Sequence, residues 1–163
     1  MSKEKIKRKI NVIRQIISVL QKWLVLVSSN AVIVIIHHTA TDRDRTTFAS
    51  VNSNHRMLGY SKSTLGFHTA YNTLIDGASD VWLARSYKKT GHATMACKSF
   101  HIDVCLTGDF TIEQPSEGQL RALEGELKTI QNIYGDYKLK IHKDYTNTLC
   151  PGDYMIKYIN DRT

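Results

Sequence analysis

The sequence predicts an α/β fold, a central mixed β-sheet flanked by helices, with an additional amphipathic helix at the N-terminus. Three observations support this class: an unbroken run of β-branched residues, several short alternating segments, and two long stretches with helical periodicity. A length of 163 residues, with 42% hydrophobic and 23% charged residues, fits one ordinary globular domain. We therefore expect a leader over residues 1–29 and a folded domain over residues 30–163.

The leader is basic and amphipathic. Residues 1–22 carry +6 of the formal net charge of +7, so the remainder of the chain is nearly neutral and a nucleic-acid footprint over the whole domain is not expected. A helix is predicted over residues 3–28, because apolar residues recur at intervals of three and four. They are Ile6, Ile10, Ile13, Ile17, Leu20, Leu24 and Val27.

Three fates of this apolar stripe stay open. Residues 1–28 could dock on the domain, form a homodimer through a second copy of the helix, or contact an anionic membrane or envelope surface. No signal peptide is expected, because Arg14 and Lys22 interrupt the apolar part of the leader. We therefore expect a protein that is cytoplasmic before its release.

The first half of the domain combines a central strand, a helix and a hairpin. The run over residues 31–36 is typical of a strand covered on both faces, with His37 at its carboxyl end, where ligands collect in open α/β sheets. Residues 46–58 have a weak helical pattern. Residues 71–75 and 81–84 predict a hairpin, because two short apolar runs flank a glycine-containing turn.

The second half alternates strands and helices. Residues 100–107 predict a strand, because apolar and polar side chains alternate there. Residues 116–134 have leucines and isoleucines at helical spacing after a serine that can cap a helix. A short strand over residues 138–141 then delivers His142, and a last helix is expected over residues 153–159.

Three metal-binding side chains follow these strands. His37, His142 and Cys150 would supply the two nitrogens and one sulfur of a catalytic zinc site, which keeps its fourth position open. The spacing of His142 and Cys150 is unlike that of a structural zinc finger, and hydrogen-bonded surface histidines are the alternative. Cys97 and Cys105 are expected in the core as reduced thiols, since three cysteines do not suggest a disulfide framework.

Several ordered blocks resemble a known family, the zinc amidases typified by phage lysozyme-amidases and peptidoglycan recognition proteins. The similarity runs from residue 31 to residue 155 and leaves out the leader. The blocks that carry it are Ile35-Ile36-His37-His38-Thr39-Ala40-Thr41, Ala70-Tyr71-Asn72-Thr73-Leu74-Ile75, Val104-Cys105-Leu106-Thr107-Gly108-Asp109-Phe110, Pro115-Ser116-Glu117-Gly118-Gln119-Leu120, and His142 through Cys150-Pro151-Gly152.

The resemblance implies a peptidoglycan hydrolase that cleaves the amide between N-acetylmuramic acid and L-alanine with Zn²⁺-activated water. It implies His37, His142 and Cys150 as zinc ligands. It also implies Tyr71 and Thr148 as catalytic donors to the developing charge, although a half-buried strand tyrosine and a loop threonine bonded to the backbone are the structural alternatives. A phage or prophage endolysin is the favoured setting.

The resemblance places His38, Thr39 and His92 at the substrate, although packing or hydrogen bonding is the alternative role of His38 and a surface-loop position that of His92. One departure is His101-Ile102-Asp103, where family members often have Ser-Ile-Gly; the added acid leaves substrate contacts at this strand open. A non-catalytic peptidoglycan-binding recognition module is the main alternative function. A membrane-active leader fused to an inert domain is the second.

Overall fold

The computed structural model describes residues 13, 14, 17 and 31–161 of the chain. The chain divides into two compact units, Met1–Ala31 and Val32–Thr163. In the first unit Ile13, Arg14 and Ile17 are helical and exposed, and most of the predicted leader helix lies outside the described residues. Within the described ranges, every helix is too short or too polar to cross a membrane.

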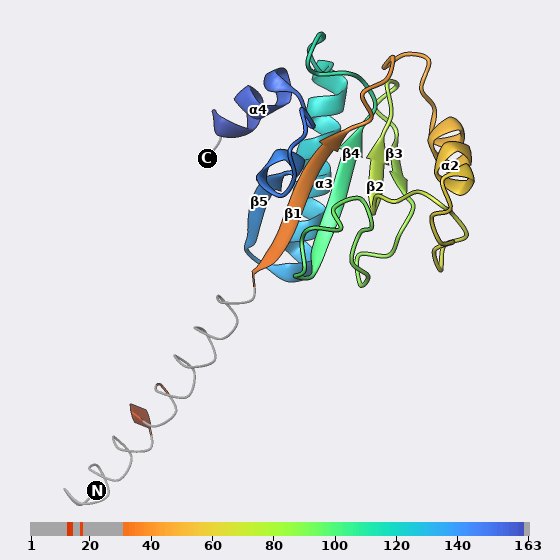
Figure 1. The fold of residues 1–163 in the computed structure, drawn as a ribbon. Coiled ribbons are helices and arrows are strands. Elements are labelled where there is room, and N and C mark those ends of the chain that lie inside the picture. Colours follow the sequence, from red (N-terminus) through yellow and green to blue (C-terminus); the bar gives the residue numbers. More distant parts are fainter. Residues whose placement is uncertain (1–12, 15–16, 18–30, 162–163) are drawn as a thin grey trace, which may run out of the picture. The chain divides into compact units, whose positions relative to one another are not determined.

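The second unit is built on a five-stranded mixed sheet with the order β3-β2-β4-β1-β5 (Figure 1). Neighbouring strands are parallel except for the antiparallel pair of β2 and β3. The predicted fold class is confirmed, and the predicted strands form. Their bounds are β1 Val32–His38, β2 Thr73–Ile75, β3 Val81–Leu83, β4 His101–Leu106 and β5 Tyr137–Ile141.

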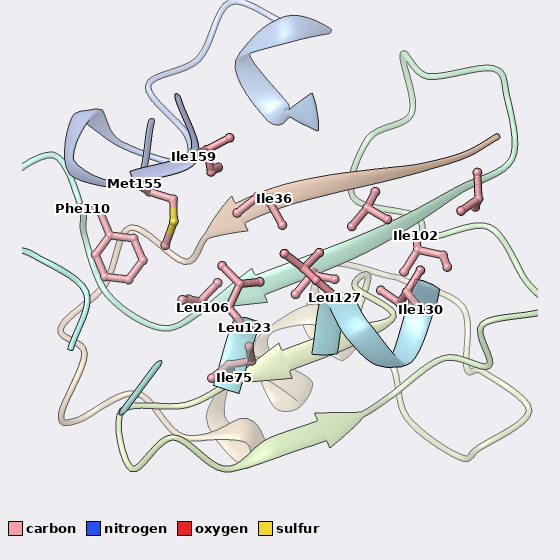
Figure 2. Packing of buried hydrophobic residues seen from close by; sticks show 13 residues of the cluster. Ile36, Ile75, Ile102, Leu106, Phe110, Leu123, Leu127, Ile130, Met155 and Ile159 are labelled. Atoms are coloured by element: carbon pink, nitrogen blue, oxygen red, sulfur yellow. The ribbon is translucent and has the colours of Figure 1, made fainter. Parts of the chain in front are cut away.

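Helices cover both faces of the sheet. Helices α3 (Glu117–Tyr134) and α4 (Asp153–Asn160) pack on one face and enclose the larger core. Helix α2 (Phe48–Met57) packs on the other face through a smaller apolar cluster that includes Leu74 and Cys105. Figure 2 shows the larger cluster, with side chains of β1, β2, β4, α3 and α4 meeting around Ile36, Ile75, Ile102, Leu106, Phe110, Leu123, Leu127, Ile130, Met155 and Ile159.

Helix α3 has the start that the sequence predicts. The hydroxyl of Ser116 accepts a hydrogen bond from the backbone N–H of Gln119, and the side chain of Gln119 accepts one from the N–H of Ser116. This capping box satisfies two N–H groups that would otherwise lack partners. Leu123, Leu127 and Ile130 then lie on one side of the helix and bury against the sheet.

The sheet brings distant residues to one edge. Side chains alternate between the two faces of a strand, so Ile36 points to the α3 side and His37 to the α2 side. Strands β1 and β5 are parallel neighbours in which Ile36 pairs with Ile141. His142 follows directly after β5 in a short 3₁₀ helix, His142–Asp144, so it lies beside the carboxyl end of β1.

Candidate metal centre

Three side chains predicted as zinc ligands converge at this edge. One ligand atom each of His37, His142 and Cys150 lies within 4.8 Å of the others. The Cys150 Sγ atom is 3.7 Å from Nδ1 of His37, and the His37 and His142 ring centroids are 4.6 Å apart. Two imidazoles and one thiol so arranged fit a catalytic zinc ion, with a fourth position left for water or substrate.

Several contacts hold the segment around Cys150 in place. The backbone N–H of His38 donates a hydrogen bond of 3.3 Å to the Cys150 sulfur, and the N–H of Cys150 donates to the Thr148 hydroxyl. Gly152 adopts a φ of +87° and packs so closely on the next loop that a Cβ would lie 2.6 Å from the Thr111 nitrogen. Only glycine combines this backbone conformation with this close approach.

Burial keeps His142 and Cys150 in their neutral forms. Burial, followed by the neighbouring His37, lowers the pKa of His142 to about 4, so its imidazole is neutral and keeps a free lone pair at neutral pH. Burial raises the pKa of the Cys150 thiol to about 12, although the His38 N–H opposes the shift. A metal ion would supply the positive charge that a thiolate needs at this position.

A cavity of about 460 Å³ opens over the three ligands. This volume is within the usual range of small-molecule sites. The lining includes six of the predicted site residues: His37, His38, Tyr71, His142, Thr148 and Cys150.

Two of these cavity-lining residues, Tyr71 and Thr148, carry hydroxyl groups. The Tyr71 ring centroid is 5.3 Å from that of His37. Burial, the neighbouring Cys105 and the nearby Cys150 raise the pKa of Tyr71 well above 10, so its hydroxyl keeps its proton. Thr148 accepts the N–H of Cys150, which leaves its own hydroxyl proton available for donation.

The three predicted substrate residues are dispersed. His38 lines the cavity but is only 6% exposed, and its Nδ1 accepts the backbone N–H of Phe110, which favours the packing role. Thr39 lines a neighbouring hollow beside α2. His92 lines another hollow together with Arg85 and lies away from the ligands.

Sequence reasoning missed two residues that contact the ligand His37 and one that lines the cavity. Asp103 and Thr94 each contact Nε2 of His37, at 2.9 and 3.1 Å. His55, from α2, lines the cavity beside Tyr71. The sequence left the effect of Asp103 on substrate contacts open; in the structure its side chain is fully buried and faces His37. An acidic residue within a buried strand could have indicated such contacts, because a buried charge requires hydrogen-bonding or oppositely charged partners.

Two known proteins are similar to this chain in sequence. An N-acetylmuramoyl-L-alanine amidase of Sus scrofa is 32% identical over 131 residues, which are 76% of this chain and 22% of the pig protein. Peptidoglycan-recognition protein SC2 of Drosophila melanogaster is 27% identical over 122 residues, 72% of this chain and 66% of the fly protein. The chain therefore spans under a quarter of the pig protein and just under two thirds of the fly protein.

A solved structure and a family profile also match this chain. The solved structure of N-acetylmuramoyl-L-alanine amidase LysC from Clostridium intestinale superposes with a TM-score of 0.70 at 22% identity, over 82% of this chain and 85% of LysC. The profile of the family Amidase_2, described as N-acetylmuramoyl-L-alanine amidase, matches residues 28–153, a range that contains His37, His142 and Cys150. The resemblance predicted from the sequence is confirmed, and the chain belongs to the N-acetylmuramoyl-L-alanine amidase family.

Proposed function

We propose that the chain is a zinc-dependent N-acetylmuramoyl-L-alanine amidase, which hydrolyses the amide between the lactyl group of N-acetylmuramic acid and the first L-alanine of the stem peptide. The convergence of His37, His142 and Cys150 under a cavity that Tyr71 and Thr148 also line carries this proposal. Family membership supports it. A module that only holds peptidoglycan would need neither a ligand triad nor two hydroxyl donors at the same point.

The chemistry divides between the ion and the protein. Zinc held by His37, His142 and Cys150 would lower the pKa of a coordinated water to about 7 and polarise the scissile carbonyl. The protein holds the ligands through the His38 N–H and the Cys150 loop. The hydroxyls of Tyr71 and Thr148 would donate hydrogen bonds to the oxygen that becomes negatively charged as water attacks the carbonyl carbon.

The test is digestion of purified peptidoglycan with and without a chelator, followed by identification of the new chain ends. New L-alanine amino groups without new reducing sugars are expected, together with their loss on chelation and return with added zinc. Cys150→Ser should remove activity, whereas Cys97→Ser, which changes a buried thiol outside the ligand group, should retain it. Undiminished binding of peptidoglycan with no new chain ends would instead support a recognition module.

The biological setting forms a separate part of the proposal. An enzyme of this kind fits a phage or prophage endolysin that remains in the cytoplasm until the membrane is opened, with residues 1–28 contacting the anionic envelope through their basic side chains. Deletion of residues 1–28 should then weaken lysis of whole cells but leave digestion of purified peptidoglycan unchanged. Equal lysis of whole cells by both proteins would remove the role of the leader.

A further inference from the structure

A buried carboxylate lies behind the candidate metal centre. Asp103 is on β4, beside β1, and the register pairs Ile35 with Asp103 and His37 with Cys105. Asp103 therefore projects from the same face of the sheet as His37, one step along the neighbouring strand. Its Oδ1 atom is 2.9 Å from Nε2 of His37, and neither side chain is more than 1% exposed.

Other donors surround this carboxylate. The Thr94 hydroxyl donates to Oδ1 at 3.0 Å, and the Ala93 N–H donates to Oδ2 at 2.9 Å. Nε2 of His101 also lies 3.5 Å from Oδ2, without forming a hydrogen bond. The loop that supplies Ala93 and Thr94 can close over Asp103 because it carries Gly91, where a Cβ would overlap the carboxylate. These donors favour an ionised, purely accepting Asp103.

An accepting carboxylate determines which nitrogen of His37 carries the proton. Nε2 of His37 must donate to Asp103, because a bare ring nitrogen and an ionised oxygen would repel each other at 2.9 Å. With Nε2 occupied in this way, Nδ1 is the ring nitrogen left to bind a metal ion. Nδ1 is the nitrogen that lies 3.7 Å from the Cys150 sulfur, on the side where the ligand atoms converge.

We propose that Asp103 is a positioning residue that fixes the tautomer and the orientation of His37 so that Nδ1 faces the metal. This inference deepens the proposed zinc amidase function and rests on it. Carboxylates that accept the second N–H of a ligating histidine strengthen metal binding, and their loss typically weakens affinity by roughly 10–100-fold.

The first test reads the tautomer directly. Long-range ¹H–¹⁵N correlation spectra of the metal-free wild-type chain should show a proton on Nε2 of His37. A bare Nε2 with the proton on Nδ1 alone would overturn the inference. Because this measurement needs no variant, no metal and no substrate, it remains informative if the amidase proposal fails or if an Asp103 variant does not fold.

The second test measures zinc affinity by competition with a chelator. Asp103→Asn keeps the size of the side chain and removes its charge, and it should weaken zinc binding roughly 10–100-fold. Asp109→Asn is the matched control, because Asp109 lies 3.8 Å from Nδ1 of His38, which is not among the three ligands. The zinc affinity of the Asp109→Asn protein should equal that of the wild type. An Asp103→Asn protein that is folded and binds zinc within twofold of the wild type would refute the inference, whereas a wild type that binds no zinc would refute the proposed function.

Discussion

Gly91→Ala is expected to destabilise the protein through the buried carboxylate. The new Cβ would overlap Oδ2 of Asp103, and it would lie 2.6 Å from the Asp103 Cγ and 2.7 Å from Oδ1 of Asn72. These separations are well inside the roughly 3.5–4.0 Å of a favourable contact, so the carboxylate has to move. Three donors hold it in place at 2.9 to 3.0 Å.

The cost follows from the hydrogen bonds that the displacement breaks. A hydrogen bond to a buried charged group contributes about 1.5–3 kcal/mol, so the loss of one or two predicts a decrease of about 3 kcal/mol in the free energy of unfolding. Gly125→Ala is the matched control. Its Cβ would meet nothing within 4 Å on the exposed side of α3, and alanine there should stabilise the helix by about 0.5–1 kcal/mol.

Urea denaturation of the metal-free proteins, followed by far-ultraviolet circular dichroism, measures both changes. In an Asp103→Ala background the cost of Gly91→Ala should fall by at least about 1 kcal/mol, because the overlap with the carboxylate is gone and only Asn72 remains in the way. If the free energy of unfolding of Gly91→Ala is within about 0.5 kcal/mol of the wild-type value, the loop does not pack closely on Asp103.

Three further changes test other parts of the molecule. Tyr71→Phe should lower kcat by about 10²–10³-fold with zinc affinity unchanged, as measured on a soluble muropeptide, and equal rates would remove its role as a donor. Burial, followed by Arg85, lowers the pKa of His55 below its ordinary 6.5, so the unfolded state binds the extra proton first and stability should fall as the pH decreases below 6.5. In urea titrations from pH 8 to 5 the wild type should lose more stability than His55→Asn, and parallel profiles would contradict this. Glu126→Ala should cost about 3 kcal/mol, because the hydroxyls of Thr73 and Tyr87 both donate to this buried carboxylate; a cost below about 1 kcal/mol would contradict that network.

The sequence predicted the elements better than their assembly. Local signals set α3, where Ser116 and Gln119 cap a segment with regular apolar spacing. The order of the strands was not predicted, because it depends on pairings between residues far apart, such as Ile35 with Asp103. The first strand extends through His37 and His38, since pairing with β4 continues to that point.

The sequence predicted the three candidate ligands of the site. It did not predict the residues that hold those ligands in place. Residue type suggested His37, His142 and Cys150, and the resemblance to the zinc amidases implied them as ligands; the fold brings the three side chains together. The alternation of β4 placed Asp103 on a definite face of the strand. It could not show that the loop with Gly91 folds over that face and gives the carboxylate its partners, because those contacts depend on the path of an irregular segment.

X-ray absorption at the zinc edge reads the proposed metal site directly. One zinc ion per chain is expected, with a single sulfur neighbour at about 2.3 Å from Cys150 and nitrogen neighbours at about 2.0–2.1 Å from the two histidines. Cys150→Ser should remove the sulfur signal. A zinc-loaded wild type without a sulfur neighbour, or a chain that takes up no zinc at all, would contradict the account.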